Sequence, residues 1–411
     1  MRVLFTTVAQ STHLYNMVPL AWAMHTAGHE VRIMSSDQLA DRIEATGLIA
    51  LPVPAPLPPP RRLTSDDFIY GEPRPPVLDW EYMLGKFAVF SGLMFPYYEP
   101  HPLREQIVRF ARTWRPDLVV WDMFSFSGAA AAVASGAAHV RMLVGLDFMG
   151  QMRAMFLDRL RRQPEELRDD PLAELLTTPI PGTDLAFDEE LVVGQYTIDP
   201  LPSALRLPVD LEYLPLRYVP YHGPAPCPSW VHEPPRRPRV CLTLGLTARE
   251  GWDVGELSVE EMFDAVADLD VEVVATFNAE QARSARPVPA NVRLVDFVPL
   301  QALLPSCSAL IHHGGTGSFG TALVHGVPQL IVPHGYWDTT PKANFLAERG
   351  AGLHLPVDEF SADAMREALT HLVKDSSFRT GAAAVQAENQ ARPSPNDLVP
   401  ALEKIAAERR R

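Results

Sequence analysis

The stretch IHHGGTGSFG, residues 311–320, decides the fold of the chain. The apolar run at 308–311 has the composition of a buried strand, and residues 321–326 continue as a short helix that ends at Gly326. A glycine-rich turn from a strand into a helix presents backbone N–H groups and the positive end of the helix dipole. We therefore expect this turn to bind a phosphate or diphosphate, with its two histidines as further hydrogen-bond donors.

Strand and helix patterns alternate on both sides of this turn, and short loops between such elements indicate parallel βαβ units. The chain is therefore expected to be an α/β protein with two Rossmann-like, doubly wound domains and a ligand cleft at the carboxyl ends of the strands. The predicted strands are 3–7, 30–34, 117–121 and 139–143 in the first half, and 239–244, 271–276, 292–295, 309–311 and 329–332 in the second. Helices are predicted at 17–26 and 127–135, and near 361–374 and 400–409.

A chain of 411 residues is too long for one ordinary core, so two domains are expected. Prolines crowd the stretch from Pro220 to Pro238, which can continue neither a helix nor a central strand. We predict an N-terminal domain at 1–217, a proline-rich linker at 218–237 and a C-terminal domain at 238–411. Whether the last helix packs back on the N-terminal domain stays open at this point.

The composition of the chain limits the classes of partner that it is expected to bind. The net charge of −14 argues against nucleic acid and anionic membranes, which both attract clustered Lys and Arg. No run of about 18 apolar residues predicts a membrane span, and the chain starts directly as a strand, so a cytoplasmic location is expected. The three cysteines are widely spaced and form neither a disulfide framework nor a zinc site, so no metal is expected.

Residues 315–320 also match the dinucleotide pattern GxGxxG. That pattern belongs to the first strand-to-helix turn of its domain, whereas here it follows about the fourth strand of the second domain. An NAD-dependent oxidoreductase therefore stays open as an alternative, and so does a non-catalytic helper that binds nucleotide sugars.

A longer pattern of motifs in the second half of the chain is more specific for one protein family than GxGxxG is. HHGGTGS at 312–318, VHGVPQ at 324–329 and WDT at 337–339 follow one another in the order seen in family 1 glycosyltransferases of the GT-B fold, and the chain resembles that family. The N-terminal segments STHLYNMVPLA at 11–21 and AGHEV at 27–31 resemble the opening of bacterial enzymes that attach deoxysugars or aminodeoxysugars to macrolide-type polyketide antibiotics. The resemblance implies an inverting transferase that uses a nucleotide-sugar donor and needs no metal or other cofactor.

The same resemblance assigns the catalytic residues. His13, expected in the loop after the first strand, would be the general base that removes the acceptor hydroxyl proton, since imidazoles as a class titrate near neutral pH. Asp122, at the end of a predicted buried strand, would orient His13 and stabilise its imidazolium form. The alternatives are a loop histidine packed beside Tyr15 and an N-cap carboxylate for the following helix.

Donor binding is assigned in the same way. Thr321 stands where plant relatives carry a ribose-binding Glu, and Thr339 stands where many relatives carry Gln, so the resemblance favours a dTDP-linked deoxysugar. For Phe297, a core position at a strand end is an equal alternative to stacking on the base. The implied residues are Thr247, His313, Gly315, Thr316, Gly317 and Ser318 for the diphosphate, Phe297, Val298 and Thr321 for the nucleoside, and Asp338 and Thr339 for the donor sugar.

Large apolar residues between positions 68 and 156 would suit a hydrophobic aglycone, although ordinary core packing would account for part of the set. The candidates for acceptor binding are Phe68, Trp80, Met83, Phe87, Phe148 and Met152. The expected reaction is transfer of a deoxysugar from a dTDP-sugar to a hydroxyl of a polyketide or macrolide-type aglycone in antibiotic biosynthesis. Some such enzymes need a helper protein resembling a cytochrome P450; that partner, with the helices around 80–98 as its contact, and a homodimer stay open here.

Overall fold

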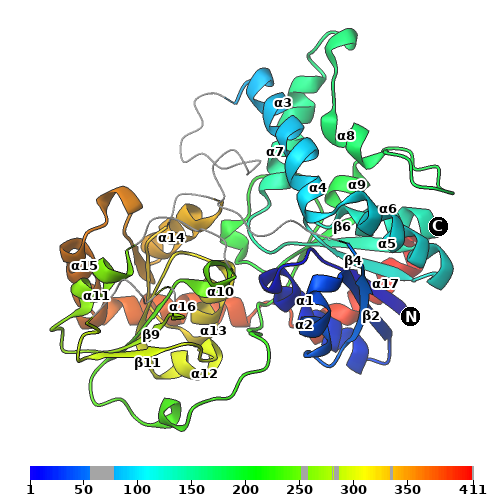
Figure 1. The fold of residues 1–411 in the computed structure, drawn as a ribbon. Helices are drawn as coiled ribbons and strands as arrows, with labels where there is room; N and C mark the ends of the chain where they lie inside the picture. Colours follow the sequence, from blue (N-terminus) through cyan, green and yellow to red (C-terminus); the bar gives the residue numbers. More distant parts are fainter. Residues whose placement is uncertain (56–77, 251–257, 280, 282–286, 334–336, 410–411) are drawn as a thin grey trace. The chain divides into compact units, whose positions relative to one another are not determined.

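The computed structural model describes residues 1–55, 78–250, 258–279, 281, 287–333 and 337–409. Within it the chain forms two compact units. The first contains the described residues up to Arg217 together with the segment from Pro393 onward, and the second contains those from Tyr218 to Arg392. Figure 1 shows the strands at the centre of each unit with helices around them.

The first unit is built on a parallel sheet in the order β3-β2-β1-β4-β5-β6-β7. Its strands are β1 (Arg2–Thr6), β2 (Glu30–Ser36), β3 (Ile49–Val53), β4 (Leu118–Asp122), β5 (Ala138–Met142), β6 (Tyr196–Asp199) and β7 (Tyr213–Pro215). Its helices are α1 (Ser11–Thr26), α2 (Ala40–Glu44), α3 (Trp80–Val89), α4 (Phe95–Tyr98), α5 (His101–Trp114), α6 (Phe126–Ser135), α7 (Phe148–Leu160), α8 (Pro171–Leu176), α9 (Glu190–Val193) and α17 (Pro395–Arg409). A π-helical segment, Phe90–Met94, joins α3 to α4, and 3-10 turns lie at Asp37–Leu39, Glu165–Leu167 and Ser203–Leu205.

The second unit has a parallel sheet in the order β10-β9-β8-β11-β12-β13. Its strands are β8 (Arg239–Thr243), β9 (Glu272–Thr276), β10 (Val292–Val295), β11 (Cys307–His312), β12 (Gln329–Ile331) and β13 (Gly352–His354). Its helices are α10 (Gly245–Arg249), α11 (Val259–Val266), α12 (Leu300–Leu303), α13 (Thr316–His325), α14 (Thr339–Glu348), α15 (Ala362–Lys374) and α16 (Ser377–Gln390). Short 3-10 turns lie at Ser229–His232, Leu304–Ser306 and Val357–Glu359.

Side chains of the second sheet alternate between two cores, as the pleat of a strand requires. Along β8, Val240 and Leu242 enter one buried cluster, and Cys241 between them enters the other. On β11, Ile311 belongs to the first cluster and Leu310 to the second. Both faces of the sheet are therefore covered, which is the usual situation of an all-parallel sheet.

Strand order reverses once in each sheet. In the first unit the reversal lies between β1 and β4, which pair with Thr6 opposite Trp121. The second unit reverses between β8 and β11, which pair with Thr243 opposite His312. Loops that leave the carboxyl ends of two such strands diverge, so these are the positions where doubly wound sheets bind ligands.

The predicted α/β class with doubly wound sheets is confirmed, but several predicted elements differ from the structure. Helix α1 begins at Ser11, six residues before the predicted start, and contains Pro19. The sequence prediction also missed β3, β6, β7 and β13, each of at most five residues. Thr247 lies in the short helix α10.

Residues 393–409 pack with the first unit although they follow the second along the chain. Helix α17 lies against α1 and β5 and buries Leu398, Val399 and Leu402. The Arg217 amide donates to the Pro393 carbonyl at 2.7 Å, where the chain leaves the first unit and returns to it. The domain limits 1–217, 218–237 and 238–411 stay predictions. Among the described residues, no helix has both the length and the apolar composition needed to cross a bilayer.

Gly128 lets helix α6 approach the sheet, and its replacement tests this packing. A Cβ at this position would overlap the Thr6 hydroxyl and lie 2.5 Å from Trp121 Cβ, both buried. We expect Gly128→Ala to destabilise the protein by about 1–3 kcal/mol through overpacking. The matched control is Gly85→Ala in α3, where no atom lies within 4 Å of the new Cβ and alanine favours the helix by up to about 1 kcal/mol. A thermal midpoint of Gly128→Ala at or above that of Gly85→Ala would contradict the packing.

Candidate active site

His13 and Asp122 form a hydrogen-bonded pair at the reversal of the first sheet. His13 lies in the first turn of α1, not in the predicted loop, and Asp122 is the last residue of β4. His13 Nδ1 is 2.7 Å from Asp122 Oδ2. The Asp122 carboxyl is fully buried and the imidazole is 10% exposed. An Nδ1–H bonded to the carboxylate leaves the Nε2 lone pair for an incoming proton, which is the tautomer a general base needs.

Asp122 is fixed by its own loop as well. Its Oδ1 accepts the Phe124 amide at 2.9 Å, so both carboxylate oxygens are engaged. Asp122 does not cap the next helix, because Ser125 occupies the N-cap position of α6. The Phe124 ring lies 5.7 Å from the His13 ring and stacks on Tyr98 at 5.8 Å. The end of β4 and the loop after it thus both contact the imidazole.

A second carboxyl group, Glu99, lies buried beside this loop. Its Oε1 accepts the Ser125 hydroxyl at 2.6 Å, and its Oε2 accepts the amide and the hydroxyl of Ser127 at 2.9 and 2.8 Å. Burial raises the pKa of Glu99 to about 7, against the lowering effect of these bonds and of Arg104. Glu99 therefore ties the end of α4 to the start of α6, next to the segment that carries Asp122. Sequence reasoning missed it because a lone Glu gives no signal of burial.

In the second unit, the glycine turn follows β11 and opens helix α13. The N-cap of α13 is Gly315, so no side chain satisfies the first amides of the helix. Gly314 has a φ of 99°, a conformation that favours glycine. Its amide donates to His312 Nδ1 at 3.1 Å, and His312 Nε2 lies 2.8 Å from Gln329 Oε1. Burial lowers the pKa of His312 to about 3, so this histidine is a neutral support for the turn.

His313 is buried between two glycines. A Cβ at Gly315 would lie 2.7 Å from His313 Nε2, and one at Gly245 would lie 2.9 Å from its Cε1. Gly245 opens α10 after β8, so the imidazole is enclosed by the two loops of the strand-order reversal. Thr247, in the same helix α10, is half-buried. The structure therefore places the start of α10, the helix that carries Thr247, and the start of the turn 315–318 against His313.

Lys342 was not predicted, yet it is fully buried next to this turn. Its Nζ donates to Thr316 Oγ1 at 2.7 Å, to Asp338 Oδ1 at 2.7 Å and to the Gly314 carbonyl at 3.2 Å. Burial lowers the pKa of Lys342 and the Asp338 carboxylate opposes this. The spacing of Asp338 and Lys342, four residues apart at the start of α14, is the sequence signal that would have found the pair.

The remaining donor candidates differ in exposure. Phe297 is half-buried with the Arg249 guanidinium 5.8 Å from its ring centre, and Val298 belongs to a core cluster. Thr321 is fully buried, and its hydroxyl donates to the Gly317 carbonyl at 2.6 Å. Thr339 is buried against Gly314. Their roles in binding stay predictions.

The acceptor candidates lie mostly in the interior. Met83, Phe87, Phe148 and Met152 are buried, and their role in acceptor binding stays a prediction. Trp80 is partly exposed and stacks on Phe156 at 5.3 Å. Phe68 lies outside the described residues.

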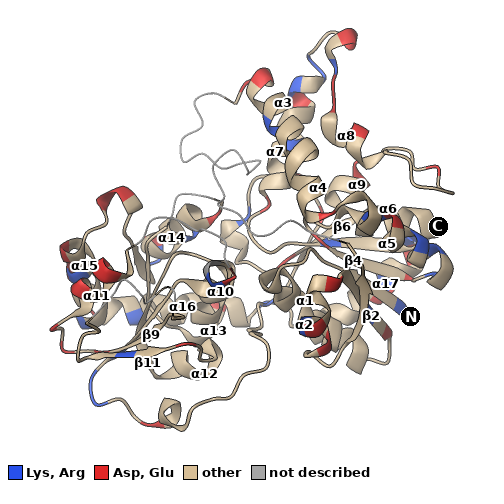
Figure 2. Ribbon diagram, viewed as in Figure 1, with Lys and Arg blue, Asp and Glu red and all other residues tan. Residues whose placement is uncertain are grey.

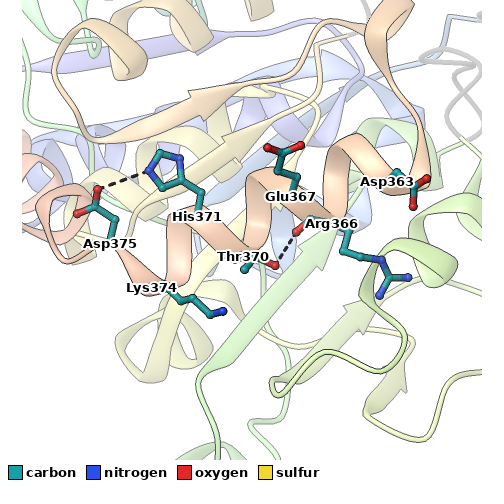
Figure 3. Close-up of a pocket in the computed structure, with 7 residues that line it drawn as sticks. All are labelled: Asp363, Arg366, Glu367, Thr370, His371, Lys374 and Asp375. Atoms are coloured by element: carbon teal, nitrogen blue, oxygen red, sulfur yellow. Dashed lines mark hydrogen bonds and ion pairs between the residues drawn. The ribbon is translucent and has the colours of Figure 1, made fainter.

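A surface depression in the second unit lies apart from this chemistry. Figure 3 shows it along α15, lined by Asp363, Arg366, Glu367, Thr370, His371, Lys374 and Asp375. This helix carries both acidic and basic residues (Figure 2), which is typical of a solvated face. Among the residues that the structure describes, no three His, Cys, Asp or Glu side chains gather in a way that would hold a metal ion.

Comparisons with known proteins agree with this architecture. Residues 22–245 match the N-terminal domain, and residues 260–405 the C-terminal domain, of the family described as erythromycin biosynthesis protein CIII-like. The chain is 48% identical to the aclacinomycin-T 2-deoxy-L-fucose transferase of Streptomyces galilaeus, over 100% of this chain and 97% of that protein. It is 45% identical to the 3-alpha-mycarosylerythronolide B desosaminyl transferase of Saccharopolyspora erythraea, over 100% and 99%.

Among solved structures, the glycosyltransferase VinC in complex with DTDP superposes with a TM-score of 0.91 at 44% identity, covering 99% of this chain and 100% of that one. The two-unit architecture and these likenesses define a glycosyltransferase of the GT-B fold. The chain belongs to the erythromycin biosynthesis protein CIII-like family of antibiotic glycosyltransferases. The predicted family, fold and enzyme class are thereby confirmed.

The buried Glu99 gives a testable pH dependence. Its pKa in the folded protein, about 7, lies above the ordinary value of 4.5, so the folded state binds the proton more tightly. This contribution to stability is complete below pH 4.5 and is lost as the pH rises through 7. Glu99→Gln has no such proton, so from pH 4.5 to 8 its free energy of unfolding should fall less than that of the wild type, by on the order of 3 kcal/mol.

Urea unfolding at several pH values measures this difference. Glu81→Gln, on the exposed side of α3, is the matched control and should follow the wild-type profile. Parallel profiles for wild type and Glu99→Gln would show that Glu99 is not buried as described.

Proposed function

We propose that this enzyme transfers a deoxysugar from a dTDP-sugar to a hydroxyl group of a polyketide or macrolide-type aglycone, with inversion and without a metal ion. The hydrogen bond between His13 and Asp122 at the reversal of the first sheet carries the proposal. In this reaction the first unit supplies the base and binds the acceptor, and the second binds the donor.

The step is a single displacement. His13 Nε2 takes the proton of the acceptor hydroxyl, and the oxygen forms a bond to the anomeric carbon. The bond from that carbon to the diphosphate breaks, and its electron pair leaves with the diphosphate. Asp122 stabilises the imidazolium that forms, and the amides of the turn 315–318 stabilise the leaving group.

Two observations support the choice of substrates. The relatives named above transfer 2-deoxy-L-fucose and desosamine, and VinC was solved with DTDP. Thr321 is short, and its hydroxyl is occupied by the Gly317 carbonyl, so it is a poor partner for the two hydroxyls of a ribose diol. A 2'-deoxyribose needs no such partner. A helper protein resembling a cytochrome P450, in contact with the helices at 80–98, and a homodimer stay predictions from the resemblance.

Removal of the base should slow turnover strongly while the fold persists. We expect His13→Ala to lower kcat by about 10²–10⁴-fold, the usual contribution of a general base. Asp122→Asn should lower kcat as well, because the amide disfavours the required tautomer and the imidazolium. Assays with a dTDP-deoxysugar and a polyketide aglycone in excess EDTA measure the effect. Activity of the wild type in the same assays tests that the reaction needs no metal.

His25→Ala is the matched control, since His25 is exposed on the same helix α1. Its kcat should equal that of the wild type. Full turnover by His13→Ala would contradict the assignment of the base, and loss of wild-type activity in EDTA would contradict the metal-free mechanism.

The nucleotide can be identified before any substrate is known. A ligand that binds only the folded protein raises the unfolding midpoint, with about 2.7 kcal/mol of stabilisation at a hundredfold excess over Kd. In a thermal-shift panel of dTDP, UDP, ADP and NAD, we expect dTDP to give the largest shift and NAD none. A shift with NAD alone would favour the oxidoreductase alternative, and equal shifts with dTDP and UDP would remove the preference for deoxyribose.

A further inference from the structure

We propose that Lys342 is a positioning residue of the donor site, which sets the Thr316 hydroxyl as a hydrogen-bond donor to the diphosphate and holds the Asp338 carboxylate against the glycine turn. The inference rests on the proposed function, because it concerns the same donor site. It adds a residue and an orientation that the chemistry of transfer does not by itself require.

The contacts of Lys342 leave its ammonium no freedom. The side chain is fully buried, and its three acceptors are Gly314 O, Thr316 Oγ1 and Asp338 Oδ1. Three acceptors match the three protons of an ammonium group, which has no lone pair with which to accept. The Phe319 ring centre lies 5.7 Å from Nζ and adds a cation–π contact. The charged form of Lys342 is therefore the form that fits.

The direction of one bond decides the role of Thr316. Since Lys342 only donates, Thr316 Oγ1 accepts, and its own proton cannot point at Nζ. Thr316 is half-buried and is the first residue of α13, beside the uncapped amides of that helix. The hydroxyl proton is thus available on the side where these amides bind an anion. A hydroxyl can either donate or accept a hydrogen bond. The bond from Lys342 leaves the Thr316 hydroxyl as a donor, and a phosphate oxygen needs a donor.

The Asp338 side chain bonds Lys342 and not the amides of its own helix. Asp338 occupies the N-cap position of α14, where an aspartate ordinarily accepts an amide of the helix, but its side chain makes no capping bond. Instead its Oδ1 is 2.7 Å from Lys342 Nζ, with both side chains almost fully buried. The preceding Trp337 has a φ of 56°, the left-handed region that side chains other than glycine seldom adopt. Lys342 therefore connects the loop assigned to the donor sugar with the turn assigned to the diphosphate.

The experiment removes the ammonium without leaving a buried charge unpaired. The double variant Asp338→Asn/Lys342→Met keeps the volume of both side chains and neutralises both. We expect its affinity for dTDP to fall about tenfold or more, as for the loss of a hydrogen bond to a charged group, and its affinity for thymidine, which lacks the diphosphate, to stay within twofold of wild type. Calorimetric titration measures both ligands.

Thr316 supplies the readout that a purely structural role would not change. Thr316→Val should weaken dTDP binding about tenfold in the wild type, and Thr316→Ser should not. In the Asp338→Asn/Lys342→Met background, Thr316→Val should cause no further loss, because the hydroxyl is no longer oriented. Additive losses would overturn the inference. Should the double variant fail to fold, a Thr316→Val protein that binds dTDP as tightly as Thr316→Ser would overturn it as well.

Lys374→Met, an exposed lysine on α15 of the same unit, is the matched control and should bind dTDP as the wild type does. A wild-type protein that does not bind dTDP would overturn the proposed function, and this inference with it. A wild type that binds dTDP and a folded double variant that binds it equally well would overturn the inference alone.

Discussion

The reversal of strand order in each parallel sheet is the constraint on which the proposed chemistry depends. At β1 and β4, it makes neighbours of two residues that are 109 positions apart, so a histidine in the first turn of α1 and the carboxylate that ends β4 meet at 2.7 Å. At β8 and β11, it brings α10 and the glycine turn around His313. A parallel sheet without a reversal would send all these loops the same way and would lack the diverging loops at which doubly wound sheets bind ligands.

These loops are held in place by buried ionisable groups. Asp122, Glu99 and Lys342 are each removed from water, and each has several hydrogen-bond partners. Burying such groups costs free energy that their pairing offsets only in part. What they provide is direction, because a fully bonded group fixes which atoms of its neighbours donate and which accept. Neutral His312 acts in the same sense, with one ring nitrogen on a backbone amide and the other on Gln329.

Much of the fold was readable from the sequence, because long apolar strands and glycine punctuation have strong local causes. The family, the fold and the glycosyltransferase class were predicted correctly. The predicted start of α1 was wrong: the helix begins at Ser11 and continues through Pro19, which has no backbone N–H to donate. Glu99 and Lys342 were missed because charged residues are normally exposed, and the partners of Glu99 lie 26 and 28 positions away. Short edge strands such as β7, whose pairing is decided by tertiary contacts, carry little signal of their own.

The return of the chain to the first unit has a consequence for synthesis. Helix α17 covers α1 and β5 with Leu398, Val399 and Leu402, yet it is translated after all of the second unit. Domains generally fold in the order in which they leave the ribosome. The surface of α1 and β5 that α17 covers therefore stays uncovered until about 175 residues of the second unit have been made. Apolar surface that is exposed during synthesis favours aggregation, so the contacts of α17 with α1 and β5 also protect the finished first unit.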